Sequence, residues 1–388
     1  MSMKLYKRTW AEISLDALEK NYRAYRDSVS DKIDIMCVVK AFCYGHSDRI
    51  VTPFLQSELG VKWFAVSNLD EAIRLRKAGI TGNILILGYT SPDEAEELEE
   101  FDIIQAVVSP EYARELSENA VGSVRCHIAV DTGMTRIGLR GTPEEIADGI
   151  CVIAAMDKLK VEGAFTHYAV ADTLTDDCIA YTERQAELLY AAADIARARG
   201  VKLDTVHSLN SAGGLFRCDE RSSLARLGII LYGLKPDYAL DMPIDIEPVM
   251  SLKSTVSQVK TVEAGVDISY GRTFTTPKEM KIATVACGYA DGYPRALSNI
   301  GDVLIHGRRC RIVGRVCMDQ FMCDVSDVPD VKAGDTVTLI GFEGGERITA
   351  DDIGQLTGTI GYEIVCGISE RVPRAAVQDG EYTGIFKL

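Results

Sequence analysis

The sequence lacks any apolar run close to the roughly 20 residues that a membrane-spanning helix needs. It also lacks a surplus of basic residues, because 42 lysines and arginines stand against 57 aspartates and glutamates, a formal net charge of −15. Such a charge repels phosphate backbones and anionic headgroups, so we expect no nucleic-acid partner and no membrane partner. The segment from Met1 to Glu12 contains no apolar core of a signal peptide.

Cysteine pairs of the Cys-x-x-Cys type are also absent, although the chain has eleven cysteines. No spacing of cysteines and histidines matches a zinc site, so we expect no metal. An odd number of cysteines without a pairing motif is typical of reduced thiols that pack inside a cytoplasmic protein. The 388 residues are 47% hydrophobic and 26% charged, which indicates a globular protein of about two domains.

Strand-like runs are the main pattern of roughly the first 230 residues. Each run is almost continuously apolar and precedes a helix-patterned segment, which is typical of parallel strands covered on both faces. Ser91-Pro92 and Thr142-Pro143 are typical helix starts, with a capping hydroxyl before a proline. Eight parallel strands favour a (β/α)8 barrel of the TIM type over the alternative, an open doubly wound sheet. We expect them over residues 34–41, 63–67, 83–88, 103–108, 124–131, 161–167, 203–208 and 223–227.

A second pattern begins after Pro236, Pro243 and Pro248, which mark a connection. Only short helices fit beyond it, for instance over residues 351–356. We therefore expect a barrel domain over residues 1–243, of which the first ~10 could join the other domain, and a mainly antiparallel β domain over residues 244–388. The strand-like runs of the second domain cover residues 252–262, 281–287, 302–306, 309–316 and 336–340.

A lysine, Lys40, lies at the end of the first strongly apolar strand. Catalytic groups gather at this face of such a barrel, and a partly desolvated lysine can form a Schiff base with an aldehyde. The turns His207–Gly214 and Arg226–Ile229 stand at the ends of the seventh and eighth strands, where these barrels commonly bind phosphate. A lysine and a phosphate site on one face indicate pyridoxal phosphate, although each segment alone also fits a solvated lysine or an ordinary turn.

The chain also carries a long series of motifs that cover it almost from end to end. Because so many motifs occur in the family's order, the sequence resembles the bacterial alanine racemases, which are pyridoxal-phosphate enzymes with a barrel domain followed by a β domain. The motifs are Trp10–Ile13, Val38–Ala41, Tyr44–His46, Val130–Met134, Arg136–Gly138, Thr166–His167, Asn210–Ala212, Met250–Lys253, Ser269–Gly271, Gly288–Arg295, Gly314–Gln320 and Arg371–Arg374.

The resemblance implies a racemase that interconverts L- and D-alanine with two acid/base groups. Lys40 would hold the cofactor and serve one face of the substrate, and Tyr270 of a second subunit would serve the opposite face. Tyr289, Met318 and Asp319 would also come from the second subunit, with the first two bordering the substrate. The active unit would then be a homodimer with shared active sites that acts on a small amino acid.

The resemblance also implies which residues hold the cofactor. Arg226 would face the pyridine nitrogen, which an arginine cannot protonate, and His207 would link Arg226 to Tyr270 through hydrogen bonds. Arg136 would contact the substrate carboxylate or the phenolic oxygen of the cofactor. The remaining cofactor-binding residues would be His167 beside the ring and Tyr44, Asn210, Ser211, Gly228, Ile229 and Tyr362 around the phosphate.

Two departures from the family pattern bear on the substrate. Many relatives steady the arginine at position 136 with a carbamylated lysine at the position of Ala129, and alanine cannot carry a carbamate. Phe42-Cys43 stands where the family usually has Asn-Ala, so we expect the aromatic ring to reshape the pocket. A serine or broad-specificity racemase therefore remains an alternative. So does a protein that binds the cofactor without turnover, whereas a barrel-type decarboxylase lacks support because its glycine-rich phosphate loop is missing.

Overall fold

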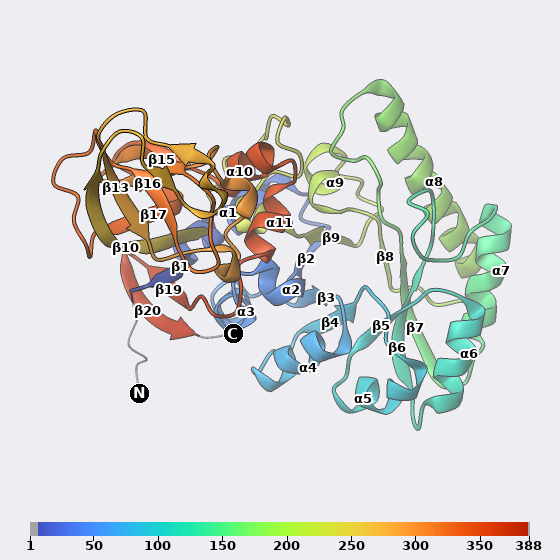
Figure 1. Cartoon of the computed structure of the whole chain (residues 1–388). Helices are drawn as coiled ribbons and strands as arrows, with labels where there is room; N and C mark the ends of the chain where they lie inside the picture. The colour runs from blue at the N-terminus through green and yellow to red at the C-terminus, as the bar shows by residue number, and fades with distance from the viewer. Residues whose placement is uncertain (1–6, 387–388) are drawn as a thin grey trace.

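The computed structural model describes residues 7–386, which form two lobes (Figure 1). A barrel with its helices makes one lobe, and a β-sheet domain makes the other. The first six residues, part of the segment in which we expect no signal peptide, lie outside the described range. Over residues 7–386, no helix is both long and apolar enough to cross a membrane.

Eight parallel strands form the barrel, and every strand that we predicted overlaps one of them. The two edge strands of this sheet, β8 and β9, come together at a bridge between Leu209 and Ala225, where the Arg226 N–H donates to the Leu209 carbonyl at 3.0 Å, so the barrel is nearly closed. The strands are β2 (Asp34–Val38), β3 (Trp63–Val66), β4 (Asn83–Ile86), β5 (Ile104–Val107), β6 (Val124–Ala129), β7 (Leu159–Phe165), β8 (Thr205–His207) and β9 (Leu224–Leu227).

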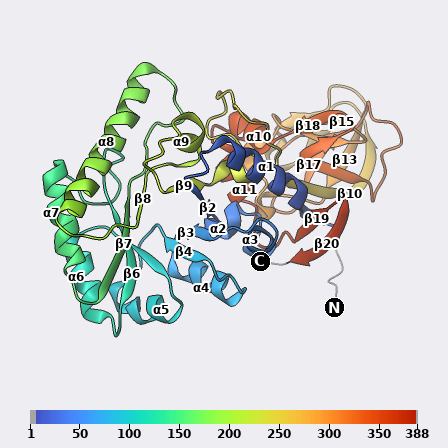
Figure 2. The same ribbon diagram turned by 180° about the vertical axis from the view of Figure 1, so that it is seen from behind.

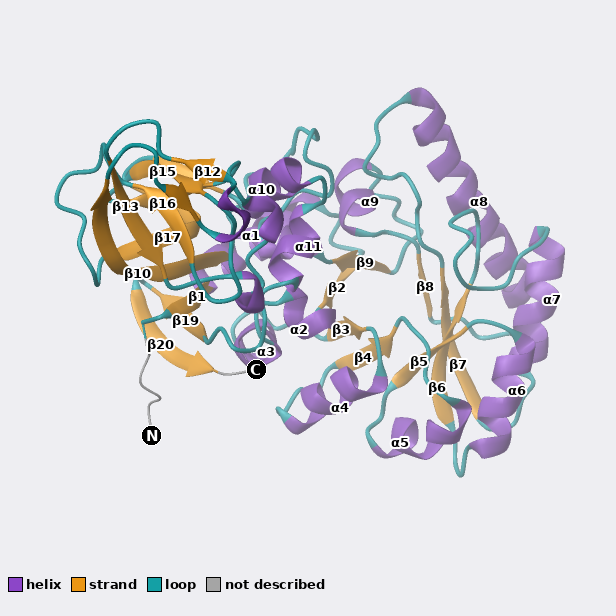
Figure 3. Cartoon of the chain, viewed as in Figure 1, coloured by secondary structure: helices purple, strands orange, loops and turns teal. Residues whose placement is uncertain are grey.

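Helices alternate with these strands along the chain (Figure 3). The predicted start at Thr142 is a capping box, because its hydroxyl accepts from the Glu145 N–H at 3.3 Å and the Glu145 carboxylate accepts from the Thr142 N–H at 2.8 Å. Ser91 similarly precedes the turn η1 (Pro92–Glu94). The helices are α1 (Leu15–Ser28), α3 (Asp48–Ser57), α4 (Leu69–Lys77), α5 (Ala95–Glu100), α6 (Pro110–Asn119), α7 (Pro143–Ala154), α8 (Asp176–Ala198) and α9 (Ser211–Phe216).

A ten-stranded sheet forms the second lobe, and all of its strand pairs are antiparallel except β1 with β19. Strand β17 pairs with β10 as well as with β14, so six of the strands close on themselves. The predicted fold class, a (β/α)8 barrel followed by a mainly antiparallel β domain, is confirmed. The strands are β1 (Thr9–Ser14), β10 (Met250–Val262), β13 (Met280–Val285), β14 (Asp302–Ile305), β15 (Arg308–Val313), β16 (Phe321–Asp324), β17 (Thr336–Glu343), β18 (Glu346–Ile348), β19 (Arg374–Gln378) and β20 (Glu381–Phe386).

Strand β1 shows that the two lobes do not divide the chain into two consecutive pieces. It begins the described chain, yet it lies in the sheet of the second lobe, between β10 and β19. The predicted runs do not cover β1, β16, β18, β19 or β20, and a small hairpin of β11 (Asp267–Ile268) with β12 (Phe274–Thr275) lies apart from the main sheet.

Two short helices, α10 (Ala350–Thr357) and α11 (Gly361–Cys366), lie where the lobes meet (Figures 1 and 2). The first of them covers the predicted helix over residues 351–356. A Cβ atom on Gly45 would lie 2.2 Å from the carbonyl oxygen of Val365, so glycine is what lets α11 rest directly on the chain that follows β2. One continuous apolar core extends through both lobes, which fixes them to one another.

Candidate active site

A cavity of about 1020 Å³ opens at the carboxyl ends of the barrel strands. Helix α11 of the second lobe supplies Tyr362 and Cys366 to its wall, so the cavity exists only where the two lobes are docked. The predicted site residues that line it are Lys40, Tyr44, Arg136, His167, Asn210, Ser211, Arg226, Gly228, Ile229 and Tyr362.

Lys40 lies just beyond strand β2 and faces this cavity. Burial lowers the pKa of its amine, and the positive charge of Arg136 lowers this pKa further. A lowered pKa increases the neutral, nucleophilic fraction of the amine near neutral pH. The side chain therefore has the position and the protonation state that a Schiff-base lysine requires.

The segment that carries Lys40, α2 (Lys40–Tyr44), is a left-handed turn. Its last four residues have φ angles between 51° and 57°, and none of them is glycine. Each non-glycine residue in this conformation costs roughly 1–2 kcal/mol. Neighbouring contacts must therefore hold the turn in place.

Three buried side chains hold this turn. Nδ1 of His46 lies 2.9 Å from the carbonyl oxygens of Cys43 and Tyr44, so it carries the proton and donates to both. The Glu71 carboxylate accepts from the Ala41 N–H at 2.8 Å, and the Arg374 Nε donates to the Gly45 carbonyl at 2.9 Å. Burial lowers the pKa of His46 to about 4, which keeps the ring neutral. His46 therefore supports the backbone and is not among the residues that line the cavity.

Arg374 is a fully buried cation, and no carboxylate pairs with it in the described chain. Burial lowers its pKa to about 10, so the guanidinium still carries its charge at neutral pH. Carbonyl oxygens replace the missing carboxylate as acceptors. Besides Gly45 they belong to Ile368, Ser369 and Val372, at distances of 2.6 to 2.7 Å.

A small polar cradle lines the same cavity as Lys40. The Gly228 N–H donates to the Ser211 hydroxyl at 2.8 Å, and a Cβ atom on Gly228 would lie 3.1 Å from the Tyr44 hydroxyl. The Tyr362 ring stands edge-on to the Tyr44 ring, 6.2 Å away between centroids. Asn210 shapes the cradle rather than facing it, because its side-chain oxygen accepts from the Gly213 N–H at the start of α9. Hydroxyl groups around an open glycine are suited to an anionic group such as a phosphate.

Arg226 forms the floor of the cavity and is 3% exposed. Its guanidinium donates to the Thr166 carbonyl at 2.7 Å, to the Ser208 carbonyl at 3.1 Å and to Nδ1 of His207 at 2.8 Å. Nδ1 of His167 lies 3.5 Å from the same guanidinium, on the cavity side. Burial lowers the pKa of Arg226 to about 10, so it remains a charged donor.

The structure corrects the expected link from His207 to Tyr270. His207 is completely buried behind Arg226, and its second ring nitrogen lies 3.1 Å from Nδ1 of His127. Both nitrogens are therefore occupied by residues of the barrel core, and neither can reach a tyrosine hydroxyl. His167 is the histidine that stands beside Arg226 at the cavity surface.

Arg136 lines the cavity without a hydrogen bond or ion pair of its side chain to any residue in the described range. Ala129 packs against Ala106 and Phe165, so an apolar surface occupies the place where many relatives carry a charged group. The guanidinium of Arg136 is therefore available to a ligand.

The structure also corrects the expected influence of Phe42. Its ring lies under the guanidinium of Arg74, 4.6 Å from the ring centre, and it is not among the residues that line the cavity. The left-handed turn explains this, because it directs Phe42 towards helix α4 while Lys40 and Tyr44 face inwards.

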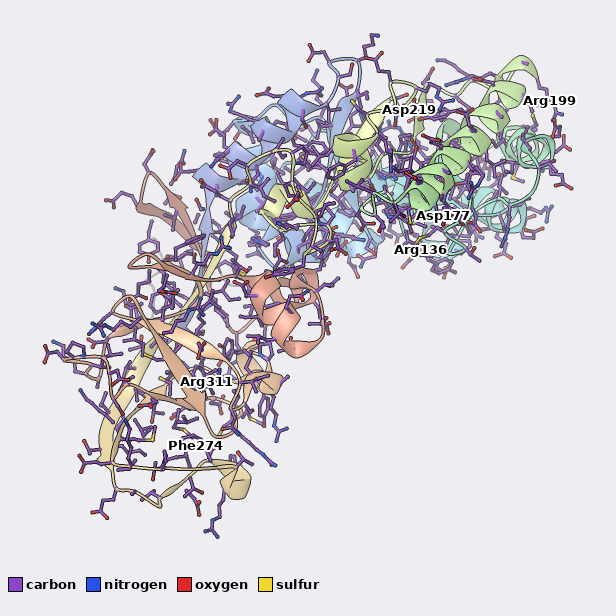
Figure 4. The ribbon with its side chains drawn as sticks, turned by 90° about the horizontal axis from the view of Figure 1, so that it is seen from above. Arg136, Asp177, Arg199, Asp219, Phe274 and Arg311 are labelled. Atoms are coloured by element: carbon purple, nitrogen blue, oxygen red, sulfur yellow. The ribbon has the colours of Figure 1, made fainter. Side chains whose placement is uncertain are left out.

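Four of the five predicted residues of the second lobe lie outside the cavity, and only Tyr362 lines it. Tyr270 is 73% exposed, and Tyr289 and Met318 are also exposed, as is the carboxylate of Asp319. Figure 4 labels Phe274, shortly after Tyr270, in the β-domain lobe and Arg136 in the barrel lobe. The structure thus brings ten of the predicted residues together and leaves these four on an open surface.

Comparison with known proteins places this arrangement in a family. Residues 13–236 match the family model "Alanine racemase, N-terminal domain", and residues 249–376 match "Alanine racemase, C-terminal domain". The chain belongs to the alanine racemase family. The resemblance that the sequence motifs indicated is therefore confirmed.

Individual relatives align over nearly their whole length. An alanine racemase of Halothermothrix orenii is 41% identical over 96% of this chain and 98% of its own. The structure of alanine racemase from Clostridium difficile superposes with a TM-score of 0.92 at 37% identity, covering 99% of each chain. A histidine racemase of Leuconostoc mesenteroides also superposes, with a TM-score of 0.87 at 28% identity over 97% of this chain and 100% of its own.

The sequence analysis did not identify three residues that support the site, namely Glu71, Arg374 and His127. Glu71 and His127 stand outside every motif that we singled out, and each acts from a different strand or helix than the residue it touches. Arg374 ends a motif that we did single out, but its partner Gly45 is more than three hundred positions away in the sequence. Only the folded chain reveals these contacts.

We predict that Arg374→Lys loosens the left-handed turn. A lysine cannot bond four carbonyl oxygens in a planar fork, so buried acceptors lose their partners. Hydrogen–deuterium exchange of the amides of residues 41–47 should become about tenfold faster or more, since each unmet buried group costs about 1–3 kcal/mol. The exposed Arg308→Lys is the matched control and should change nothing. Unaltered exchange in Arg374→Lys would show that Arg374 does not hold the turn.

Proposed function

We propose that this chain is a pyridoxal-phosphate-dependent racemase that interconverts L- and D-alanine. The single observation that carries the proposal is the half-buried Lys40, whose position in one cavity with an anion cradle and whose lowered pKa suit an aldehyde cofactor with a phosphate. Membership of the alanine racemase family supplies the substrate class.

The residues present fit this cofactor. The open Cα of Gly228, with the Ser211 and Tyr44 hydroxyls around it, is a cradle that a larger residue would fill. Lys40, this cradle and Arg226 line the same cavity. When bound, pyridoxal phosphate withdraws electrons from an attached amino acid and makes its Cα proton removable.

Each barrel residue then has a definite task. The Lys40 amine, whose pKa burial and Arg136 lower, removes or returns the proton on one face of Cα. Arg226 can only donate hydrogen bonds, so it orients a ring nitrogen without protonating it and limits the electron withdrawal. Arg136, which has no partner of its own among the described residues, binds the substrate carboxylate.

The second acid/base group comes from another copy of the chain. Racemisation needs a proton donor on the face opposite Lys40, and the candidate, Tyr270, is an exposed residue of the β domain that does not line its own cavity. Tyr289 and Met318 are exposed in the same lobe. Exposed aromatic and apolar side chains of this kind are typical of a subunit interface, so the active unit is a homodimer with shared sites.

A cluster of ion pairs around the buried Asp291 holds this exposed surface in shape. Asp291 is fully buried and receives the Arg8 guanidinium at 2.7 Å and that of Arg371 at 3.1 Å, while Arg371 also bonds Asp319 at 2.8 Å. The Ala290 N–H donates to the Met318 carbonyl at 3.0 Å, which ties the two loops together. The loops that carry Tyr289, Met318 and Asp319 are therefore fixed before any partner binds.

The cysteines support a cytoplasmic location. All eleven are free, and buried ones such as Cys37 and Cys126 pack in the apolar core. Burial raises the pKa of Cys126 to about 12, so its thiol stays protonated and unreactive. Thiols used in this way are typical of proteins in a reducing compartment.

Serine is the second candidate substrate. Two departures from the family pattern favoured serine, namely Phe42 and Ala129. Phe42 lies outside the cavity and no longer supports serine, whereas the small Ala129 lines the cavity together with Arg136 and still does. The similar structure of a histidine racemase indicates that this fold is not restricted to amino-acid substrates with the smallest side chains. Alanine remains the first substrate because the family match is to alanine racemases.

We predict that the loaded protein racemises L-alanine and that Lys40→Ala abolishes the reaction. Loss of optical activity should be followed separately with L-alanine and L-serine, with Lys40→Ala as the blank in both. A higher kcat/KM for serine would transfer the assignment to a serine racemase. If neither amino acid were racemised while the cofactor is bound at Lys40, the chain would be a protein that binds the cofactor without turnover.

We also predict that two inactive variants restore each other. Lys40→Ala and Tyr270→Phe should each be inactive alone, but a mixed dimer contains one site with both groups intact. Random assembly of equal amounts, by co-expression, should therefore give about a quarter of the unmodified activity. If mixing restored nothing although mixed dimers form, Lys40 and Tyr270 would not share a site across subunits.

A further inference from the structure

Besides His207, another histidine, His127, lies behind Arg226 in the barrel core. His127 on β6 is fully buried, and its Nδ1 lies 3.1 Å from Nε2 of His207 on β8. His207 in turn lies 2.8 Å from the Arg226 guanidinium on β9. These three side chains form one hydrogen-bonded row that leads from the cavity floor into the core.

Two local features of the strands make the contact between the histidines possible. Strand β7 runs between β6 and β8, and the residue that it pairs with His127 is Gly163, which has no side chain. A Cβ atom on Gly163 would lie 3.0 Å from Nε2 of His127. The pairing of β6 with β7 also shifts register between Cys126 and His127, and such an irregularity re-aims the side chains beside it.

The rings around this row fix its orientation. The Phe165 ring is stacked on His207 at 5.2 Å between centroids, and His127 meets His207 edge-on at 5.2 Å. Trp63 lies 6.0 Å from His127 on another side. The packed aromatic surroundings leave the two imidazoles little freedom to rotate.

The direction of the hydrogen bonds follows from the arginine. A guanidinium has donors and no acceptor, so Nδ1 of His207 must accept and the proton of this neutral ring must be on Nε2. That proton is then donated to Nδ1 of His127, whose own proton is on Nε2. Nε2 of His127 has no partner among the described residues, so the row ends there.

We infer that His127 is a positioning residue for the reaction, acting through His207 on Arg226. By accepting from Nε2 of His207, it holds that ring in the one tautomer that can accept from Arg226. The guanidinium is thereby kept in a fixed direction towards the cavity, where it meets the ring nitrogen of the cofactor. This part of the inference rests on the proposed function, whereas the tautomer of His207 does not.

The first test measures the tautomers directly. In protein labelled with ¹⁵N-histidine, with and without bound cofactor, the ring resonances of His207 and His127 should both show a neutral imidazole with its proton on Nε2. Assignment comes from the variants described next. A proton on Nδ1 of His207 would overturn the inference, and this outcome does not depend on any activity. If the protein racemised nothing, the proposed function alone would fail.

The second test compares two substitutions of nearly equal size. His127→Asn places an amide oxygen near the position of Nδ1 and keeps an acceptor, while His127→Leu removes it. We expect His127→Leu to lower kcat for alanine about tenfold or more, with KM nearly unchanged and with mixed His207 tautomers, because a buried donor loses its acceptor. His127→Asn should stay within about threefold of the unmodified enzyme. Equal losses in both variants, or an unchanged kcat in His127→Leu, would show that His127 only packs.

Discussion

The active site depends on the unfavourable backbone turn that carries Lys40. A run of four left-handed, non-glycine residues does not form by itself, so the surrounding contacts must fix it. One of these contacts, Arg374, and the helix α11 that rests on Gly45 belong to the second lobe. The lysine is therefore placed by the docking of two domains rather than by its own strand, which explains why the enzyme needs its β domain even within one subunit.

The two buried guanidinium groups, of Arg226 and Arg374, are hydrogen-bonded in the same way. Neither Arg226 nor Arg374 pairs with a carboxylate in the described chain, and backbone carbonyls accept most of their hydrogen bonds. A carboxylate beside Arg226 would cancel its charge, whereas carbonyl oxygens satisfy its donors and leave the charge in place. That charge, together with burial, lowers the pKa of His167 to about 3 and keeps the neighbouring imidazoles neutral. Neutral imidazoles can accept as well as donate, and the row behind the cavity depends on this.

The site residues in this chain fall into two classes that the structure separates. Most of those of the barrel converge on one cavity together with Tyr362, whereas Tyr270, Tyr289, Met318 and Asp319 of the β domain lie exposed. The buried Asp291 holds the loops that carry the last three. Rigid, exposed side chains are suited to complete a site on another copy of the chain. Of the two positions that depart from the family pattern, Ala129 lines the cavity and Phe42 does not, because the turn carries Phe42 away from it.

The sequence by itself determined the eight barrel strands, the five main strands of the β domain and the lysine with its phosphate turns, because these depend on local periodicity and on motifs. Tertiary structure alone decided the direction of Phe42, the partner of His207 and the roles of His46, Glu71, Arg374 and His127. The physical reason is that a side chain's partner is set by which strands become neighbours and by backbone angles that the surroundings impose. His127 meets His207 because their strands β6 and β8 both flank β7, whose Gly163 leaves space beside His127, and no local pattern encodes that contact.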